Sequence, residues 1–178
     1  MPSPGKKSGS AEASLAARLA AIRLIILDVD GTLTDGTILY DAGGRELKSF
    51  HVHDGFGIVR ASALGLHFAI ATGRSSPAVT LRARELGIRD LYQNCRDKGA
   101  LVERLRKKYR LTRSQICCMS DDVQDGEFLL AGGLRVAPSD ADPEIRRLAD
   151  IVTRRGGGRG AVREIIDRIL RSQRLIPR

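Results

Sequence analysis

The chain has 178 residues, enough for one domain with a substantial hydrophobic core. Its net charge of +9 and its pI of about 10.1 raise the possibility of nucleic-acid binding. However, aromatic residues make up only 4% of the chain and tryptophan is absent, so side chains for stacking on bases are scarce. No nucleic-acid-binding motif and no apolar stretch of membrane-spanning length is present. We therefore expect no nucleic-acid partner, no membrane association, and a basic surface that suits an anionic substrate.

The N-terminal segment is rich in Ser, Gly, Ala and Lys, and it lacks the apolar core of a signal peptide. We predict a disordered arm over residues 1–20, a single domain over 21–172 and a short tail over 173–178. The three cysteines, Cys95, Cys117 and Cys118, show neither a metal-ligand spacing nor a disulfide framework. Their pattern is typical of a protein of the reducing cytoplasm.

Apolar runs and helical periodicities alternate from Ile22 onward, which indicates an α/β fold with a parallel sheet. Strands are predicted over residues 22–27, 66–71, 116–119 and 134–137, and a β-hairpin with a glycine turn is predicted over 36–52. Helices are predicted over residues 57–64, from Pro77 to about Gly87, over 98–109 and 123–131, after Pro143, and over 161–170. The adjacent Cys117 and Cys118 should point to opposite faces of their strand.

Two acidic residues, Asp28 and Asp30, follow the first predicted strand in the run Asp28-Val29-Asp30-Gly31-Thr32. Ligand sites in such folds lie at the carboxyl ends of the strands. Two carboxylates there are costly unless a cation pairs with them, and Mg²⁺ prefers oxygen ligands. A carboxylate can also act as a covalent nucleophile. The alternative is an Asp-rich turn that caps a helix, and these five residues alone do not separate the two.

Three further polar clusters follow predicted strands or begin predicted helices. Thr72-Gly73-Arg74 offers a hydroxyl, backbone N–H groups and a guanidinium, which suit a phosphate. Lys98 begins a helix, where the macrodipole opposes a cation, and a lysine at such a position suits an anionic ligand. Asp121 follows the third strand and can complete a Mg²⁺ site, with Asp122 and Asp125 nearby. Each cluster also has an ordinary explanation: helix capping for the Thr and Asp clusters, and a solvated surface lysine for Lys98.

Taken together, the Asp28/Asp30 pair, Thr72, Lys98, and Asp121 with Asp125 occur in an order that resembles the haloacid dehalogenase-like phosphatases. The resemblance covers residues 22–170 and implies a Rossmann-like three-layer α/β/α sandwich without a large cap domain. It implies Mg²⁺-dependent phosphomonoester hydrolysis with Asp28 as nucleophile and Asp30 as acid and base. It further implies that Asp28, Asp30 and Asp121 hold the metal, that Thr72 and Lys98 bind phosphate, and that Asp122 and Asp125 support the site.

Several longer segments resemble one group in this family, the phosphatases of 3-deoxy-D-manno-octulosonate 8-phosphate. These segments are 28–36, 46–50, 54–58, 71–74, 90–93 and 157–164. The resemblance implies a keto-sugar acid phosphate as substrate, a role in lipopolysaccharide biosynthesis, and a cytoplasmic homotetramer whose neighbours cover each other's sites. Gly73, Arg74 and Arg159 are candidates for binding the substrate. Ser120 replaces the usual Gly of this group, and His51 and His53 replace the usual Asn and Arg.

Other protein classes with similar parts fit less well. A phosphorylated receiver domain also has Asp, Asp-Asp, Thr and Lys on a parallel sheet, but there the paired acids come first, whereas here Thr72 and Lys98 precede Asp121 and Asp122. A P-loop enzyme would need a G-x-x-x-x-G-K-[ST] motif, which is absent. A non-catalytic or regulatory homologue, or a phosphatase for a different sugar phosphate, remains the alternative to test.

Overall fold

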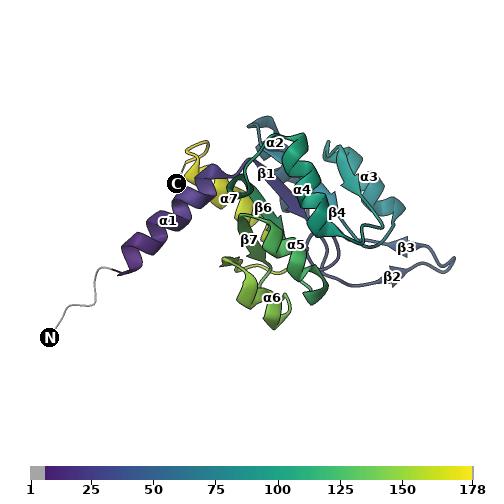
Figure 1. Cartoon of the computed structure of the whole chain (residues 1–178). Helices are drawn as coiled ribbons and strands as arrows, with labels where there is room; N and C mark the ends of the chain where they lie inside the picture. The colour runs from purple at the N-terminus through teal and green to yellow at the C-terminus, as the bar shows by residue number, and fades with distance from the viewer. Residues whose placement is uncertain (1–6, 178) are drawn as a thin grey trace.

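The computed structural model describes the backbone of residues 7–177 and the side chains of residues 14–177. Six parallel strands form one sheet in the order β5-β4-β1-β6-β7-β8, and a separate two-stranded hairpin projects from the body (Figure 1). The strands of the sheet are β1 (Leu24–Leu27), β4 (His67–Ala71), β5 (Asp90–Tyr92), β6 (Ile116–Met119), β7 (Leu134–Ala137) and β8 (Ile151–Val152). The predicted α/β fold with a parallel sheet and a small hairpin is therefore confirmed.

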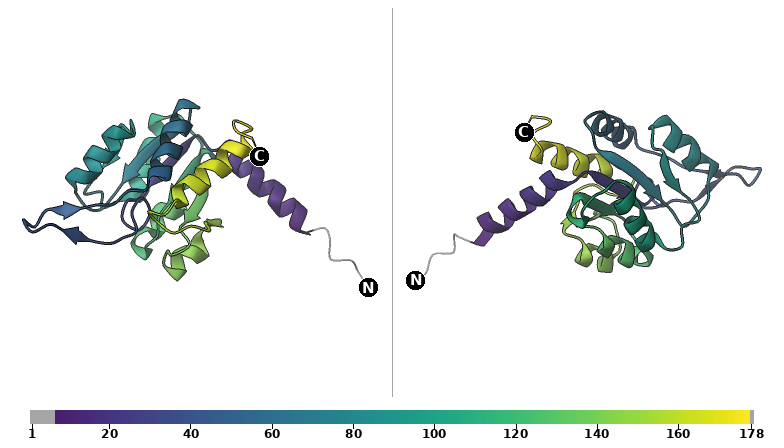
Figure 2. Two further views of the ribbon diagram at one scale, coloured as in Figure 1. Left: turned by 180° about the vertical axis from the view of Figure 1, so that it is seen from behind. Right: turned by 45° about the horizontal axis from the view of Figure 1, so that its top comes forward.

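The sheet is covered by helices on both faces, which makes three layers. One face packs against α2, α3 and α7, and the other packs against α4, α5 and α6. Figure 2 shows α7 beside α2 on the first of these faces. The helix bounds are α2 (Val52–Ala63), α3 (Pro77–Glu85), α4 (Lys98–Lys108), α5 (Gly126–Ala131), α6 (Pro143–Leu148) and α7 (Ala161–Ser172), with short 3₁₀ turns η1 (Arg113–Gln115) and η2 (Val123–Asp125).

Strand β1 is apolar throughout because both of its faces are buried. Ile25 and Leu27 point into the core beneath α2 and α7, whereas Leu24 and Ile26 point into the core beneath α4 and α5. The same alternation places Cys117 and Cys118 in opposite cores, as the sequence predicted.

The direction of the chain connections reverses beside β1. From β1 the chain moves to β4 and β5 on one side, and it then crosses to β6, β7 and β8 on the other. The ends of β1 and β6 therefore form a topological switch point, where ligands bind in open α/β sheets. In register, Leu27 pairs with Ile70 of β4 and with Met119 of β6, so the segments that follow all three strands meet at one edge.

The hairpin, formed by β2 (Leu39–Tyr40) and β3 (Glu46–Leu47), replaces any larger inserted domain between β1 and α2. Its apolar residues are open to solvent: Tyr40 is 62% exposed and Leu47 is 50% exposed. A two-stranded hairpin without a covered face is marginally stable in water.

The N-terminal segment differs from its prediction as a disordered arm over residues 1–20. Residues 1–6 lie outside the described residues, but Lys7–Ala21 forms helix α1. Its last turns are tied down, since Leu19 is buried and Arg18 is ion-paired with Asp150 at 2.5 Å. Leu15 and Leu19 of this helix, and Ile22 just after it, pack on the body at helical spacing. The Ser/Gly/Ala-rich composition around them obscured this pattern in the sequence.

Smaller differences concern element ends and short strands. Helix α2 begins at Val52, before the predicted residue 57, because the side chain of His51 caps it by accepting a hydrogen bond from the His53 N–H at 3.2 Å. Strands β5 and β8 were not predicted, since runs this short carry little periodicity. No helix in the described part of the chain is long and apolar enough to cross a membrane.

Candidate active site

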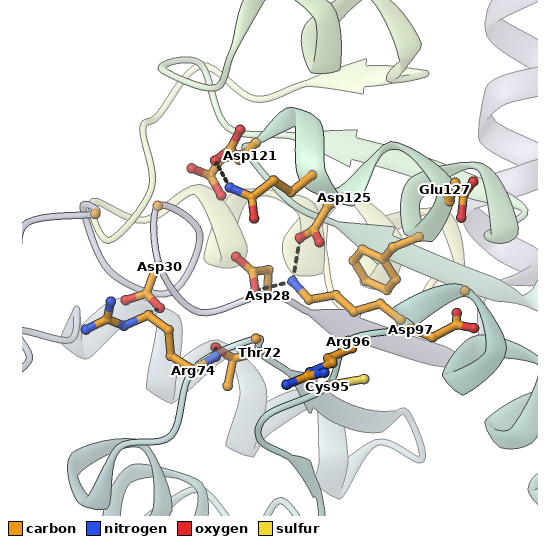
Figure 3. A pocket seen from close by; sticks show the side chains of 18 residues that line it. Asp28, Asp30, Thr72, Arg74, Cys95, Arg96, Asp97, Asp121, Asp125 and Glu127 are labelled. Carbon is orange, nitrogen blue, oxygen red and sulfur yellow. Dashed lines mark hydrogen bonds and ion pairs between the residues drawn. The ribbon is translucent and has the colours of Figure 1, made fainter.

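A pocket of about 860 Å³ opens at the switch point, and it gathers nearly all of the predicted site residues (Figure 3). These are Asp28, Asp30, Thr72, Gly73, Arg74, Lys98, Asp121, Asp122 and Asp125. They come from the segments after β1, β4 and β6 and from the first residue of α4. The convergence follows from the parallel sheet, which brings the ends of its neighbouring strands to one edge.

Asp28 and Lys98 form the centre of the pocket. The backbone N–H of Asp28 donates to the carbonyl of Met119 at 3.0 Å, which continues the β1–β6 pairing and fixes the side chain at the strand end. The Lys98 ammonium lies 2.7 Å from Asp28 Oδ1 and 2.5 Å from Asp125 Oδ2. Burial would lower the pKa of Lys98, but the two carboxylates raise it above its usual value. Lys98 is therefore a fixed cation, held between two acids.

Asp125 is held in turn by Ser120, whose buried hydroxyl donates to Asp125 Oδ2. The carboxylate of Asp125 thus receives both the Ser120 hydroxyl and the Lys98 ammonium on the same oxygen. Ser120, which replaces a usual Gly, adds a hydrogen bond that glycine could not make. The sequence showed that Ser120 replaces a glycine, but it did not indicate that Ser120 contacts Asp125.

Too little positive charge lies near Asp28 and Asp121 to offset the burial of their two carboxyl groups. Burial raises the pKa of Asp28 to about 7, although Lys98 opposes the shift. Burial also raises the pKa of Asp121 to about 6, and Asp121 Oδ1 is buried with no hydrogen-bond partner. Such a buried acceptor indicates a missing ligand. Gly31 makes room for this carboxylate, because a Cβ there would lie 1.8 Å from Asp121 Oδ2.

These observations fit a divalent cation bound by few protein ligands. No group of three or more His, Cys, Asp or Glu side chains is arranged for metal binding among the side chains of residues 14–177. Two carboxylates and a backbone carbonyl would not form such a group, and Mg²⁺ typically retains several waters in its shell. The donor set of Asp28, Asp121 and the Asp30 carbonyl is therefore sufficient for Mg²⁺.

Thr72 and its neighbours form a turn after β4 with polar groups along the pocket wall. Thr72 is buried, its N–H donates to the Tyr92 carbonyl at 2.9 Å, and its hydroxyl accepts from the Arg74 N–H at 3.1 Å. Arg74 extends across the opening, pairs with Glu46 of the hairpin, and lies 3.9 Å from Asp30 Oδ2. Gly73 leaves open space, since an added Cβ there would meet nothing within 4 Å.

Arg159 is the one predicted site residue that does not line the pocket. Its side chain is 70% exposed and is ion-paired with Asp35 at 3.3 Å. The glycines before it pack on the catalytic loop, where a Cβ on Gly157 would lie 1.8 Å from the Gly31 carbonyl oxygen. This close approach allows only glycine at position 157.

The sequence missed two charged hairpin residues, Glu46 and Lys48. The side chain of Lys48 is 3% exposed, and its ammonium is ion-paired with Asp30 and with Glu46, the latter at 3.2 Å. Both residues lie in the resemblance segment 46–50, but their local pattern is that of an ordinary polar hairpin, so only the folded contact assigns them to the site.

The fold and this pocket define a haloacid dehalogenase-like phosphatase, with an aspartate pair after the first strand and a lysine and a second acidic cluster opposite. No protein-family model matches the chain. The 3-deoxy-D-manno-octulosonate 8-phosphate phosphatase of Escherichia coli K12 is 42% identical over 165 residues, covering 93% of this chain and 88% of that protein. The chain therefore belongs to the 3-deoxy-D-manno-octulosonate 8-phosphate phosphatase family, as the sequence predicted.

Solved structures agree with this assignment. The crystal structure of the phosphatase from Yersinia pestis is 42% identical, with a TM-score of 0.87 over 89% of this chain and 86% of that one. The phosphatase from Moraxella catarrhalis, solved in complex with a magnesium ion, a phosphate ion and 3-deoxy-D-manno-octulosonate (KDO), is 36% identical. Its TM-score is 0.87, over 90% of this chain and 92% of that one.

Proposed function

We propose that this protein hydrolyses 3-deoxy-D-manno-octulosonate 8-phosphate to the free sugar acid and inorganic phosphate. The observation that carries the proposal is the convergence of Asp28, Asp30, Thr72, Lys98 and Asp121 in one pocket at the switch point. The family relationship supports the substrate, since the Moraxella catarrhalis relative was solved with magnesium, phosphate and KDO.

Asp28 and Asp121, with the backbone carbonyl of Asp30, would hold Mg²⁺, which supplies positive charge that offsets the charge of the phosphate and of the transition state. The metal would also give the buried Asp121 Oδ1 the partner that it lacks. Its positive charge would favour the ionised forms of Asp28 and Asp121, whose pKa values burial raises. Asp125, the last residue of η2, and Asp122, the residue before η2, are proposed to support this arrangement.

Asp28 acts as the nucleophile. Its carboxylate is fixed at the end of β1, with the Lys98 ammonium at 2.7 Å to favour the ionised form. One carboxylate oxygen forms a bond to phosphorus while the bond from phosphorus to the sugar oxygen breaks, which gives an aspartyl phosphate. Water then attacks the same phosphorus and restores the Asp28 carboxylate.

Asp30 transfers a proton in both steps, first as a general acid and then as a general base. It gives a proton to the departing sugar oxygen, and it later takes one from the attacking water. Its side chain is 30% exposed at the pocket opening, so it reaches the side from which a leaving group departs and water enters. One residue serves both steps because the second reverses the first in proton terms.

Five residues are assigned to binding the anionic substrate. Thr72, the Gly73 backbone and Lys98 hold the phosphoryl oxygens, where charge-assisted hydrogen bonds stabilise the transition state. Arg74 lies farther out, across the opening, and suits the sugar acid. Arg159 is exposed and is proposed to reach the substrate carboxylate of a neighbouring subunit.

The protein is proposed to work as a cytoplasmic homotetramer. The apolar residues Ile38, Leu39, Tyr40 and Leu47 of the hairpin are 47–62% exposed. A neighbouring subunit of a closed oligomer would cover this apolar surface. All three cysteines are free thiols, which suits a reducing compartment.

A phosphate-release screen of the purified protein with Mg²⁺ tests the proposal. The panel contains 3-deoxy-D-manno-octulosonate 8-phosphate, hexose phosphates and nucleotides, with Asp28→Asn as the control for contaminating phosphatases. We expect the highest kcat/KM with the keto-sugar acid phosphate. A clearly higher value for another sugar phosphate would reject the substrate, and no release from any phosphate would favour a non-catalytic homologue.

A further inference from the structure

The side chain of Lys48 is nearly buried, although the apolar residues of the hairpin next to it face solvent. Its side chain is 3% exposed, while Leu47 beside it is 50% exposed. A lysine on an exposed hairpin ordinarily extends its ammonium into water. Here the ammonium instead pairs with Asp30, which lines the pocket, and burying the ammonium costs free energy unless this pairing compensates.

The partners of Lys48 are the side chains at the pocket opening. Its ammonium donates a hydrogen bond to Asp30 Oδ1, and Glu46 Oε1 lies 3.2 Å away. On the far side of Glu46, Arg74 is bonded to Oε2, and the Arg74 Nε is 3.9 Å from Asp30 Oδ2. Two cations and two carboxylates therefore alternate in a ring that spans the hairpin, the β1 loop and the β4 turn.

Within this ring Lys48 has a specific relation to Asp30. It is the one side chain of residues 14–177 that donates a hydrogen bond to the Asp30 carboxylate, and it does so on Oδ1. The other oxygen, Oδ2, has only the distant Arg74. The ammonium thus fixes the rotation of the carboxylate and leaves Oδ2 for a reacting partner.

We propose that Lys48 is a positioning residue that holds Asp30 Oδ1 so that Oδ2 faces the leaving-group oxygen and then the attacking water. The inference rests on the proposed function, in which Asp30 moves the proton. Glu46 keeps Lys48 in place and is itself held by Arg74. The hairpin thereby contributes to the chemistry through its contact with Asp30.

The test compares two substrates whose leaving groups differ in their need for a proton. The sugar alkoxide of 3-deoxy-D-manno-octulosonate 8-phosphate must be protonated as it leaves, whereas the nitrophenolate of 4-nitrophenyl phosphate leaves without a proton. The variant Lys48→Met removes the ammonium at similar length, and Lys48→Arg restores a cation. Lys107→Met is the control, since Lys107 lies exposed on α4, away from the pocket.

Rapid-quench measurement of the first turnover gives the result. In Lys48→Met we expect release of the sugar to slow about 10²-fold, the usual size of a general-acid contribution, and release of nitrophenolate to change little. Nitrophenolate should appear as a burst, because water attack on the aspartyl phosphate still needs Asp30. Lys48→Arg should recover part of the lost rate, and Lys107→Met should match the wild type.

Three outcomes would overturn the inference. An equal loss with both substrates in the first turnover would show general damage to the site. A raised KM with normal kcat would make Lys48 a substrate-binding residue. Normal first-turnover and steady-state rates for Lys48→Met with both substrates would show no role. A wild type that acts on a different alkyl phosphate would reject only the proposed substrate, and the same comparison would then use that phosphate.

Discussion

The carboxylate of Asp54 accepts a hydrogen bond from the backbone N–H of Arg163 at 2.6 Å and thereby caps α7 from a neighbouring helix. A second bond, from the Gly160 N–H at 3.2 Å, engages the other carboxylate oxygen. Asp54 is 1% exposed, and burial raises its pKa above the usual value despite these donors. This contact fixes the glycine-rich segment that packs on the catalytic loop.

Removing this cap should destabilise the fold. Asp54→Ala leaves two N–H groups at the start of α7 without an acceptor, and we expect a loss of about 2 kcal/mol in the free energy of unfolding. Asp167→Ala, which removes only a pair with Arg163 within α7, should cost about 0.5 kcal/mol or less. Denaturant unfolding at equal protein concentrations compares them, and equal losses would contradict the capping role.

The nucleophile assignment predicts a large and specific loss of activity. Asp28→Asn keeps the shape of the side chain but replaces the attacking carboxylate by an amide. We expect turnover to fall by several orders of magnitude while the circular dichroism spectrum stays unchanged. Steady-state phosphate release measures the effect, and near-normal turnover would disprove the assignment.

The metal and proton roles can be separated by titrating Mg²⁺ against activity. Asp30→Asn keeps the backbone carbonyl, so we expect unchanged Mg²⁺ dependence and a much lower turnover. Asp121→Ala removes a carboxylate ligand and should raise the Mg²⁺ concentration needed for half-maximal activity by at least ~10-fold. If both variants keep the Mg²⁺ dependence of the wild type, the proposed metal site is wrong.

The ion pairs of Asp150 should stabilise the fold in a pH-dependent way. Burial alone would raise the pKa of Asp150, but hydrogen bonds from Arg135 and Arg18 outweigh it and hold the pKa well below its usual value of 3.8. The stabilisation is therefore present above pH 3.8 and is lost as the pH falls through the lower folded-state pKa.

Asp150→Asn should accordingly cost about 2 kcal/mol at neutral pH, because several charge-assisted hydrogen bonds weaken together. The difference from the wild type should stay constant from pH 8 to pH 5 and shrink below about pH 4. Urea unfolding across this range measures it, with Asp41→Asn on the exposed hairpin as the control. A difference that grows in acid would have the wrong sign.

We predict that the protein forms an oligomer and that the exposed apolar face of the hairpin is needed to form it. Multi-angle light scattering should give the mass of a tetramer for the wild type, and Tyr40→Asp should give smaller species with reduced activity. Leu130→Asp places the same charge on α5, away from the hairpin, and should leave the mass unchanged. A fully active monomeric wild type would remove the basis for a shared site.

The sequence predicted several strands and helices well because their signals are local. β6 and β7 match their predicted bounds, and α4 and α7 begin where predicted, since an apolar run or a helical repeat needs no knowledge of the rest of the chain. The acidic residues, Thr72 and Lys98 line one pocket for a related reason: in a parallel sheet, strand ends share an edge, so position in sequence predicts position in space.

Lys48, Asp54 and α1 escaped prediction because their roles depend on contacts between distant segments. Lys48 acquires its place only when the hairpin folds toward Asp30, and Asp54 acts on a helix far along the chain. Residues of α1 bind α7 and Asp150, and nothing in the Ser/Ala-rich composition reveals those partners. These contacts form only in the folded protein, so the local sequence pattern could not indicate them.

The contact between Gly157 and the Gly31 carbonyl has a consequence for synthesis of the protein. The loop that carries Asp28 and Asp30 leaves the ribosome before β4, β6 and β7, whereas the glycine segment that supports it emerges after all of these strands. A nascent chain can therefore pair β1 with β4 and still lack its finished catalytic loop. Hydrolytic activity should appear only after the glycine segment has emerged, when the start of α7 is free to dock.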